Sequence, residues 1–269
     1  MPLSRREAAR KLSNAGRLAL GTDFDGTLAP IVSDPKAAKP VDGVPDLLRA
    51  LSSHLYLVAV ISGRTAAFLQ EILQYPNGTG PHPMLCGLYG METWSCTSGI
   101  SKMTDASGWV EKLDRVARYI GDQISVRNIP TQPGVFVEPK GLAVAIHWRQ
   151  APDQEAVIRS IAEEIRRDEG LILQDGKMCV ELVPDFNINK GTTFAELAES
   201  SESACFIGDD LGDLSVFRAL DEMASSKETL KVAVSGPEAP AALIGSADLV
   251  LASPVEAIDF LKMLLDQSL

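Results

Sequence analysis

The sequence predicts an α/β fold with a mainly parallel β-sheet, into which a smaller α+β domain is inserted. Strand-like and helix-like segments alternate along most of the 269 residues, as they do in proteins whose parallel strands are connected by helices. Two of the apolar runs end in acidic clusters, at Asp23 and at Asp209. Because buried parallel strands place such residues at the carboxyl edge of the sheet, these clusters predict the position of a functional site.

The first part of the expected core spans residues 1–106. Its amino-terminal end, Met1–Arg17, is polar and basic and predicts a short amphipathic helix. Two continuous apolar runs predict strands, and each is followed by a segment of helical periodicity. The expected elements are strand Leu18–Asp23, helix Val44–Ser53, strand Leu55–Ile61 and helix Thr65–Leu73. The Pro-containing stretches Ile31–Pro40 and Tyr75–Pro83 are expected to be loops.

Residues 107–182 are expected to form the inserted domain, because the pattern there changes to helix, hairpin, helix, hairpin. Pro139-Lys140-Gly141 is a turn signal between the first two strands. The expected elements are helix Trp109–Ile124, strands Val135–Glu138 and Leu142–Trp148, helix Asp153–Arg167, and strands Leu171–Leu173 and Met178–Val183.

The parallel pattern returns after Pro184, so residues 183–269 are expected to complete the core. The expected elements are helix Lys190–Glu199, strand Ala204–Ile207, helix Leu214–Leu220, strand Lys231–Val234 and helix Glu256–Leu265.

Composition narrows the classes of partner. The formal charge of −11 argues against nucleic acid, since binding to its backbone needs clustered Lys and Arg, but it does not exclude a phosphorylated small molecule. No apolar stretch approaches the ~20 residues that span a bilayer, so no membrane association is expected. Four cysteines without a C-x-x-C motif indicate reduced thiols and a cytoplasmic location. We expect a monomer.

Asp23 and Asp25 are the first candidates for chemistry. Gly26 permits a sharp turn directly after the strand, which would bring both carboxylates round a common point. One carboxylate could then attack phosphorus while the other transfers a proton. The alternative is an ordinary surface turn, because Asp-Gly is a common turn dipeptide.

Two further positions indicate an anion site. Ser62-Gly63 follows the second strand and offers a hydroxyl and backbone N–H groups near a helix start, although a simple helix cap explains it equally well. Lys190 falls in the first turn of an expected helix, where the helix dipole disfavours a cation. That position suggests that the lysine serves another purpose.

The acidic cluster Asp209, Asp210 and Asp213 is the metal candidate. Mg²⁺ prefers a few carboxylates and retained water, which suits acids contributed by separate loops. The alternative is an acidic helix start that is favourable in its own right. The sequence contains no H-E-x-x-H motif and no Cys/His cluster, which argues against zinc.

Together, these motifs and their order resemble those of haloacid-dehalogenase-type phosphohydrolases. The four motifs are Asp23-Phe24-Asp25-Gly26-Thr27, Ile61-Ser62-Gly63-Arg64, Lys190-Gly191 and Gly208-Asp209-Asp210-Leu211-Gly212-Asp213. The resemblance implies a Rossmann-like core. The insert lies between the second and third motifs, which resembles the α+β cap of the C2B type.

The resemblance is more specific over nearly the whole chain. Gly87-Leu88-Tyr89-Gly90-Met91-Glu92, Val137-Glu138-Pro139-Lys140-Gly141, Ile146-His147-Trp148-Arg149 and the stretch from Lys177 to Pro184 are similar to motifs of trehalose-6-phosphate phosphatases. The chain departs from that family at four positions, because the family usually has His at Tyr89, Arg at Val183 and Thr-Asp-Glu at Gly212-Asp213-Leu214.

The residues and the resemblance together imply the following roles. Asp23 is the nucleophile that forms an aspartyl-phosphate, Asp25 is the acid and base, and Lys190 neutralises charge. Mg²⁺ is the implied cofactor, and its implied ligands are Asp23, Asp25, Asp209, Asp210 and Asp213, with Asp25 contributing its backbone carbonyl and Asp210 and Asp213 orienting waters or Lys190. The implied phosphate-binding residues are Gly26, Thr27, Ser62, Gly63, Arg64 and Lys190. The implied sugar-binding residues of the cap are Glu138, Lys140, Arg149, Lys177 and Glu181, although an ordinary charged hairpin surface would show the same residues.

The implied activity is Mg²⁺-dependent hydrolysis of a sugar phosphate, with trehalose 6-phosphate as the expected substrate. The departures at Tyr89 and Val183 leave sucrose-, mannosylglycerate- and hexose-phosphates as alternatives. Other classes of function remain possible, namely a non-catalytic regulator that binds a sugar phosphate and a mutase that uses the same aspartyl chemistry.

Overall fold

A computed structural model describes residues 3–32, 37–103, 107–236 and 239–268. By its internal contacts the chain forms two compact units. Unit 1 consists of Met1–Ser101 and Ile188–Leu269, and unit 2 is the continuous segment Lys102–Asn187.

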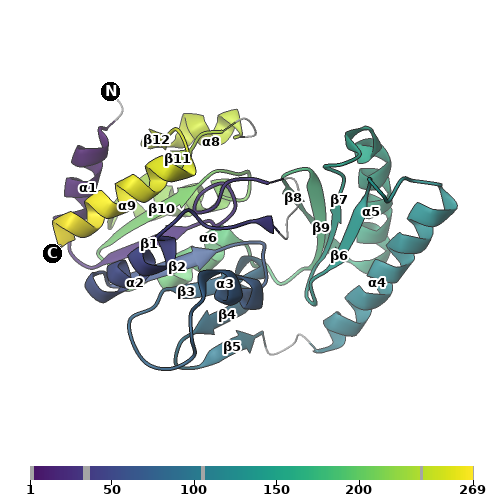
Figure 1. Cartoon of the computed structure of the whole chain (residues 1–269), viewed down its shortest axis with the longest axis horizontal. Coiled ribbons are helices and arrows are strands. Elements are labelled where there is room, and N and C mark those ends of the chain that lie inside the picture. The colour runs from purple at the N-terminus through teal and green to yellow at the C-terminus, as the bar shows by residue number, and fades with distance from the viewer. Residues whose placement is uncertain (1–2, 33–36, 104–106, 237–238, 269) are drawn as a thin grey trace. The chain divides into compact units, whose positions relative to one another are not determined.

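Unit 1 is built on an eight-stranded sheet (Figure 1). The strands lie in the order β12 (Leu249–Leu251), β11 (Glu228–Val234), β10 (Ser203–Gly208), β1 (Leu18–Thr22), β2 (Leu57–Ile61), β3 (Met84–Gly87), β4 (Glu92–Ser95) and β5 (Gly99–Lys102). The six strands from β12 to β3 are parallel, and β4 pairs antiparallel with β3.

Helices pack on both faces of this sheet because successive side chains of each buried strand point to opposite sides. Leu18 and Leu20 of β1 pack in one apolar cluster, whereas Ala19 packs in another. The first cluster includes residues of α1 (Arg5–Ser13), α2 (Val44–His54), α3 (Ala66–Leu73) and α9 (Pro254–Ser268). The second includes residues of α6 (Lys190–Leu197), α7 (Leu214–Met223) and α8 (Ala241–Ser246).

The register of the central strands brings the sequence motifs to one edge. Thr22 of β1 lies beside Ile207 of β10 and Val60 of β2. The residues that follow these strands therefore leave the sheet at the same carboxyl edge, where open α/β sheets place their sites.

Unit 2 is an antiparallel four-stranded sheet with two helices. The strand order is β6 (Phe136–Pro139), β7 (Val144–His147), β9 (Cys179–Pro184) and β8 (Leu171–Gly176). The helices are α4 (Ser107–Val126) and α5 (Glu155–Glu169), and a short 3₁₀ turn, η3 (Pro152–Gln154), precedes α5. Ile120, Ile161, Ile146 and Val180 share one buried cluster, so both helices cover the same face of this sheet.

The predicted α/β fold class is confirmed, and the expected strands and helices are present with shifts of a few residues at their ends. The expected helix Asp153–Arg167 begins within η3, and the sequence pattern predicts no element at β3, η2 (Leu88–Gly90), β4, β5, α8 or β12. These elements have three to six residues each, too few for a clear periodicity. Residues 33–36 of the expected loop Ile31–Pro40, and residues 1–2 of the expected first helix, lie outside the described part of the chain.

None of the described helices combines the length and the apolarity needed to cross a bilayer.

Candidate active site

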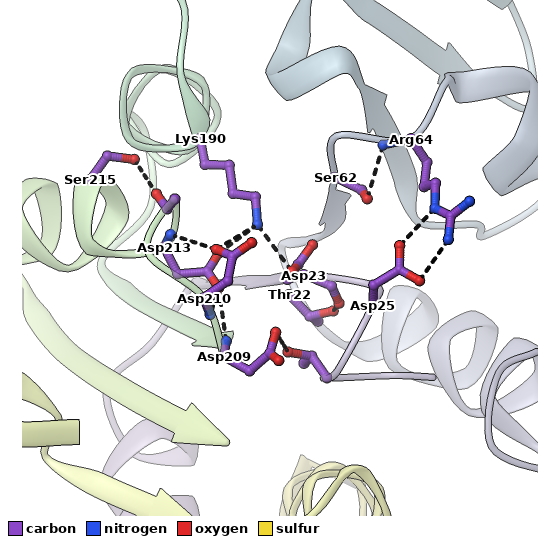
Figure 2. A network of polar contacts seen from close by, with 12 residues as sticks. Thr22, Asp23, Asp25, Ser62, Arg64, Lys190, Asp209, Asp210, Asp213 and Ser215 are labelled. Carbon is purple, nitrogen blue, oxygen red and sulfur yellow. Dashed lines mark hydrogen bonds and ion pairs between the residues drawn. The ribbon is translucent and has the colours of Figure 1, made fainter. Parts of the chain in front are cut away.

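Asp23 and Asp25 occupy a tight loop after β1, at the carboxyl edge of the unit 1 sheet (Figure 2). The backbone N–H of Asp23 donates to the carbonyl oxygen of Ile207 at 2.9 Å, which continues the pairing of β1 with β10. Gly26 then adopts a φ of 87° and donates to the carbonyl oxygen of Ala29 at 2.7 Å. Because this left-handed backbone favours glycine, the Asp-x-Asp-Gly order itself produces the turn.

Lys190 lies at the centre of the site. Its Nζ is 3.0 Å from Oδ2 of Asp23, 2.8 Å from Oδ1 of Asp213 and 3.4 Å from Oδ1 of Asp210. Burial lowers the pKa of Lys190, but the carboxylates of Asp210, Asp213 and Asp23 outweigh it and hold that pKa well above its ordinary value. The ammonium group therefore stays charged and holds the three acids together.

Asn189 caps the start of α6, the helix that carries Lys190. The side chain of Asn189 accepts hydrogen bonds from the N–H groups of Gly191 and Thr192 at 2.9 and 3.1 Å, and Thr192 caps the backbone of Asn189 in return. These bonds satisfy N–H groups at the start of the helix without a carboxylate.

Asp213 has a structural role in the acidic loop. It is fully buried, and its Oδ2 accepts from the N–H groups of Asp209 and Asp210 at 2.8 and 3.0 Å. Its Oδ1 is occupied by Lys190, and Asp210 Oδ1 in turn accepts from the N–H of Asp213 at 3.1 Å. The cluster therefore fixes the shape of the loop after β10.

Asp23, Asp210 and Asp213 form an acidic cluster in which one carboxylate oxygen from each residue lies within 4.8 Å of the others; Asp23 and Asp213 are buried and Asp210 is half-buried. The ammonium group of Lys190 contacts all three carboxylates. The same three residues are also a candidate metal site. Asp209, at the end of β10, adds a carboxylate beside Thr27, whose hydroxyl lies 3.5 Å from its Oδ1. Carboxylates from the ends of the neighbouring strands β1 and β10 are hard oxygen donors of the type that Mg²⁺ prefers, so the residues present fit that ion.

Arg64 pairs with Asp25. Its Nε and Nη2 donate to the two carboxylate oxygens of Asp25 at 2.7 and 3.0 Å, a bidentate arrangement. The guanidinium also lies 4.6 Å from the ring centre of Phe68. The residue expected to bind phosphate therefore orients the expected acid and base.

The expected phosphate-binding groups differ in whether their hydrogen-bonding atoms already have partners within the protein. Ser62 is buried at the end of β2, where its hydroxyl accepts from the N–H of Arg64 at 3.2 Å. The N–H groups of Gly26 and Thr27 donate inside their own loop. Within the described residues, no acceptor is recorded for the N–H groups of Phe24 and Asp25, which makes them better placed for an oxyanion.

Tyr89 packs against Gly63 in the loop that follows β2. The sequence pattern does not reveal this contact. A Cβ atom added at Gly63 would lie 2.8 Å from the Tyr89 hydroxyl oxygen. Leu88, Tyr89 and Gly90 have φ values of 48°, 64° and 117°, so two non-glycine residues hold a left-handed backbone. The N–H groups of Leu88 and Tyr89 donate to the carbonyls of Arg64 and Ser62 at 2.8 and 3.0 Å.

In unit 2, three of the expected sugar-binding residues come together. Lys140 Nζ lies 2.5 Å from Glu181 Oε1 and 3.9 Å from Glu138 Oε2. Glu138 also pairs with His147 Nε2 at 2.9 Å, a partner that the expected set did not include. Burial lowers the pKa of Lys140, but Glu181 and Glu138 outweigh it and raise that pKa overall. Strand pairing could have identified His147 as a partner of Glu138. Glu138 is aligned with Ala145, and His147 lies two residues further along β7 on the same face of the sheet.

The other two expected sugar-binding residues form a separate pair. Arg149, just after β7, donates from Nη2 to the backbone carbonyl of Lys177 at 3.3 Å. Lys177 lies in the turn between β8 and β9.

Comparisons with known proteins agree with this geometry. The family model described as Trehalose-phosphatase matches residues 21–243. A trehalose-phosphate phosphatase of Mycobacterium avium (strain 104) is 31% identical over 257 residues, which cover 91% of this chain and 61% of that protein. The chain thus spans about three fifths of the length of that relative.

Two solved structures share the fold. The C-terminal domain of trehalose-6-phosphate phosphatase from C. albicans has a TM-score of 0.77 at 24% identity, and the match covers 98% of this chain and 97% of that one. A haloacid dehalogenase-like hydrolase from Bacteroides thetaiotaomicron has a TM-score of 0.58 at 15% identity over 91% of this chain and 98% of that one. The expected fold is confirmed by the likeness to these two structures, and the match of the family model shows that the chain belongs to the trehalose-phosphatase family.

Proposed function

We propose that this chain hydrolyses trehalose 6-phosphate to trehalose and inorganic phosphate through an aspartyl-phosphate on Asp23. The observation that carries the proposal is the position of Asp23, a buried carboxylate at the end of β1 whose Oδ2 is held 3.0 Å from the charged Lys190. The family match and the names of the relatives supply the substrate.

In the proposed first step, a carboxylate oxygen of Asp23 attacks phosphorus and the bond to the sugar oxygen breaks. Asp25 gives its proton to that oxygen, so that trehalose leaves as a neutral alcohol. In the second step, Asp25 takes a proton from a water that attacks the phosphorus, and phosphate is released from Asp23. Arg64, bound to both oxygens of Asp25, orients the acid and must loosen its hold during proton transfer.

The chain's own groups supply part of the charge neutralisation that phosphoryl transfer needs. Lys190 and the N–H groups of Phe24 and Asp25 are the donors for the phosphoryl oxygens, and Ser62 lies on the adjacent strand end. Mg²⁺ is the proposed cofactor, held by Asp23, Asp209 and the backbone carbonyl of Asp25, where it would screen the phosphate from the nucleophile. Asp210 and Asp213 are proposed to shape that site through Lys190 and the loop backbone.

Unit 2 is proposed to act as the cap that recognises the sugar. Glu138, Lys140 and Glu181 together provide hydrogen-bond acceptors and a cationic donor, which suits the hydroxyl groups of a polyol. Arg149 and Lys177 are proposed to contribute a second group of donors.

A different sugar phosphate is the second candidate substrate, and the packing of Tyr89 favours it. The ring of Tyr89 lies against Gly63 in the loop that is proposed to bind phosphate, where the family usually has a smaller His. The larger side chain leaves less space beside the proposed phosphate site and would therefore change which sugar phosphate is bound.

The deciding experiment measures phosphate release from a panel of trehalose 6-phosphate, sucrose 6-phosphate and glucose 6-phosphate, with added Mg²⁺. We expect preference for trehalose 6-phosphate, loss of activity in excess chelator with recovery on adding Mg²⁺, and a loss of at least about a thousandfold in Asp23→Asn. Better turnover of another sugar phosphate would show that the substrate is a different one, while the proposed phosphatase mechanism would stand. No release from any compound would favour a regulator that only binds.

The chain is further proposed to be a cytoplasmic monomer that binds no nucleic acid. The four cysteines are free thiols, which supports a reducing compartment, and the net charge of −11 opposes binding to polyanions. Size-exclusion chromatography with light scattering tests the oligomeric state.

A further inference from the structure

Phe136 is an exposed aromatic side chain on the sheet of unit 2. It lies at the start of β6 and remains 44% exposed. Its neighbour on the same side of the strand is Glu138, since alternate residues of a strand share a face. The two helices α4 and α5 cover the opposite face, to which Val137 and Ile146 point. Phe136 therefore adds a large apolar surface to the face that carries the proposed sugar-binding carboxylates.

His147 holds the ring of Phe136 in place. The two residues are directly paired across β6 and β7, and their rings are stacked with centroids 5.7 Å apart and an interplanar angle of 24°. The imidazole is fixed in turn by a hydrogen-bond contact of 2.9 Å between its Nε2 and Oε2 of Glu138. Two stacked rings anchored by a carboxylate form a preorganised surface rather than a mobile side chain.

The chemistry around these rings matches a sugar ring. A pyranose presents an apolar C–H face and an edge of hydroxyl groups, so its sites combine an aromatic surface with a few placed polar groups. Glu138 and Glu181 belong to one row across β6, β7 and β9, and Lys140 lies 2.5 Å from Glu181. Inorganic phosphate alone would have no use for an aromatic ring beside two carboxylates.

We propose that Phe136, supported by His147, is the platform on which a hexose ring of the leaving group stacks, and that it helps to determine specificity for a sugar phosphate. The inference rests on the proposed function, because it assumes that unit 2 recognises the sugar. It deepens that function by assigning the apolar face of the ring to Phe136 and the hydroxyl edge to Glu138, Lys140 and Glu181.

An exposed aromatic residue by itself carries no such conclusion, since single exposed apolar side chains are normal on protein surfaces. Tyr119 on α4 is an example in the same unit, with 47% exposure. Phe136 differs because its ring is stacked on a histidine and shares a sheet face with the Glu138–Lys140–Glu181 cluster.

Three variants at this position separate the ring from its apolar bulk. Phe136→Ala removes both, Phe136→Leu keeps apolar volume without a ring, and Phe136→Tyr keeps the ring. For each, we would measure the ratio of kcat/KM for trehalose 6-phosphate to kcat/KM for p-nitrophenyl phosphate, which has no sugar. We expect this ratio to fall roughly fivefold to tenfold in the Ala and Leu variants, mainly through KM, and to stay near the parent value in the Tyr variant. Tyr119→Ala is the matched control for loss of an exposed ring.

Direct binding of trehalose 6-phosphate by the inactive Asp23→Asn protein, measured by calorimetry with and without Phe136→Ala, tests the platform without turnover. A dissociation constant that rises with the loss of the ring supports the inference. An unchanged ratio and an unchanged dissociation constant in Phe136→Ala would overturn it even if the parent enzyme is an efficient phosphatase. If the parent releases phosphate only from p-nitrophenyl phosphate and the Asp23→Asn protein binds no sugar phosphate, the proposed function and the platform both fail. Far-ultraviolet circular dichroism and thermal unfolding of each variant show whether the fold is retained.

Discussion

Lys190 shows how one residue connects the two ends of the chain. Its ammonium group, in the first turn of α6, contacts Asp23 after β1 and Asp210 and Asp213 after β10. Its side chain is only 2% exposed, so water does little to stabilise the charge of the ammonium group. Removing only one partner of such a buried ion pair strongly destabilises a protein, because the remaining charges stay buried without compensation.

Replacing Lys190 with methionine should therefore affect both folding and catalysis. We expect the free energy of unfolding to fall by about 3 kcal/mol and kcat to fall at least about a hundredfold, since three carboxylates lose their shared cation. Urea unfolding and steady-state kinetics with trehalose 6-phosphate measure the two effects. Lys262→Met is the control, because Lys262 is 60% exposed in a surface pair and should change stability by less than about 0.5 kcal/mol. Full activity in the Lys190 variant would contradict the proposed role.

The sign of the pH dependence follows from the raised pKa of Lys190. Because the folded-state value lies above the ordinary 10.5, the stabilisation by this charge is complete below pH 10.5 and is lost only as the pH rises toward the folded-state pKa. Lys190 therefore contributes no change in stability across the neutral range.

At the level of single residues, the sequence identifies which groups meet but not how they pair. Carboxylates at two strand ends predicted that Asp23 and the acidic loop meet at one edge of the sheet, whereas Lys190 was assigned to that site through the resemblance to haloacid-dehalogenase-type phosphohydrolases. The bidentate pairing of Arg64 with Asp25 was not predictable, since the two residues are 39 positions apart and Arg64 equally suits a phosphate. Such choices depend on the backbone geometry of both loops.

The turn between β3 and β4 is the element that supports the proposed phosphate loop. Leu88 and Tyr89 bind the carbonyls of Arg64 and Ser62, and the hydroxyl of Thr193 on α6 donates to the carbonyl of Tyr89 at 2.6 Å. Two non-glycine residues with positive φ store backbone strain, which persists only where surrounding contacts impose it. The turn thus links the end of β2 to the helix that carries Lys190.

Gly63→Ala tests the contact between this turn and the loop. The added Cβ would lie 2.8 Å from the Tyr89 hydroxyl, so the ring must shift, and we expect a loss of about 1 kcal/mol in unfolding free energy together with a raised KM. In the Tyr89→Gly background the same substitution should lower stability by less than about 0.5 kcal/mol, because the obstructing ring is gone and φ of 64° suits glycine. Urea unfolding of the four proteins and their KM values provide the measurement.

Gly121→Ala is the matched control for a Gly-to-Ala change, since α4 leaves open space at that position. It should raise stability slightly because alanine favours the helix. Equal losses for Gly63→Ala in both Tyr89 backgrounds would show that the tyrosine ring is not the cause.

At the level of elements, long periodic segments were predicted well and short ones were missed. The apolar runs of β1, β2 and β10 and the amphipathic stretch of α5 have clear periodicity, and each was identified within a few residues. Strand β3 has four residues and is stabilised by pairing with β2 and β4 rather than by its own pattern. The Tyr89 turn was missed for the same reason, because tertiary contacts impose its conformation.

The two units of the molecule differ in how the chain builds them. Unit 1 needs two distant segments of the chain to complete its sheet, since β10 lies between β1 and β11. Unit 2 is continuous in sequence and has its own buried cluster, in which Ile120, Trp148, Ile161 and Val180 pack together. A continuous segment with its own hydrophobic core meets the physical requirements of an independently folding domain.

The segment 102–187 should therefore fold without the rest of the chain. Produced alone, it should show native-like secondary structure and a cooperative thermal transition, with coincident midpoints by circular dichroism and by the fluorescence of Trp109 and Trp148. Ile161→Ala should lower its unfolding free energy by about 3 kcal/mol, because Ile161 is buried between helix and sheet. Val126→Ala, at a position that is 76% exposed, is the control and should have little effect. A broad, non-cooperative transition in the isolated segment would show instead that unit 2 depends on unit 1 for its fold.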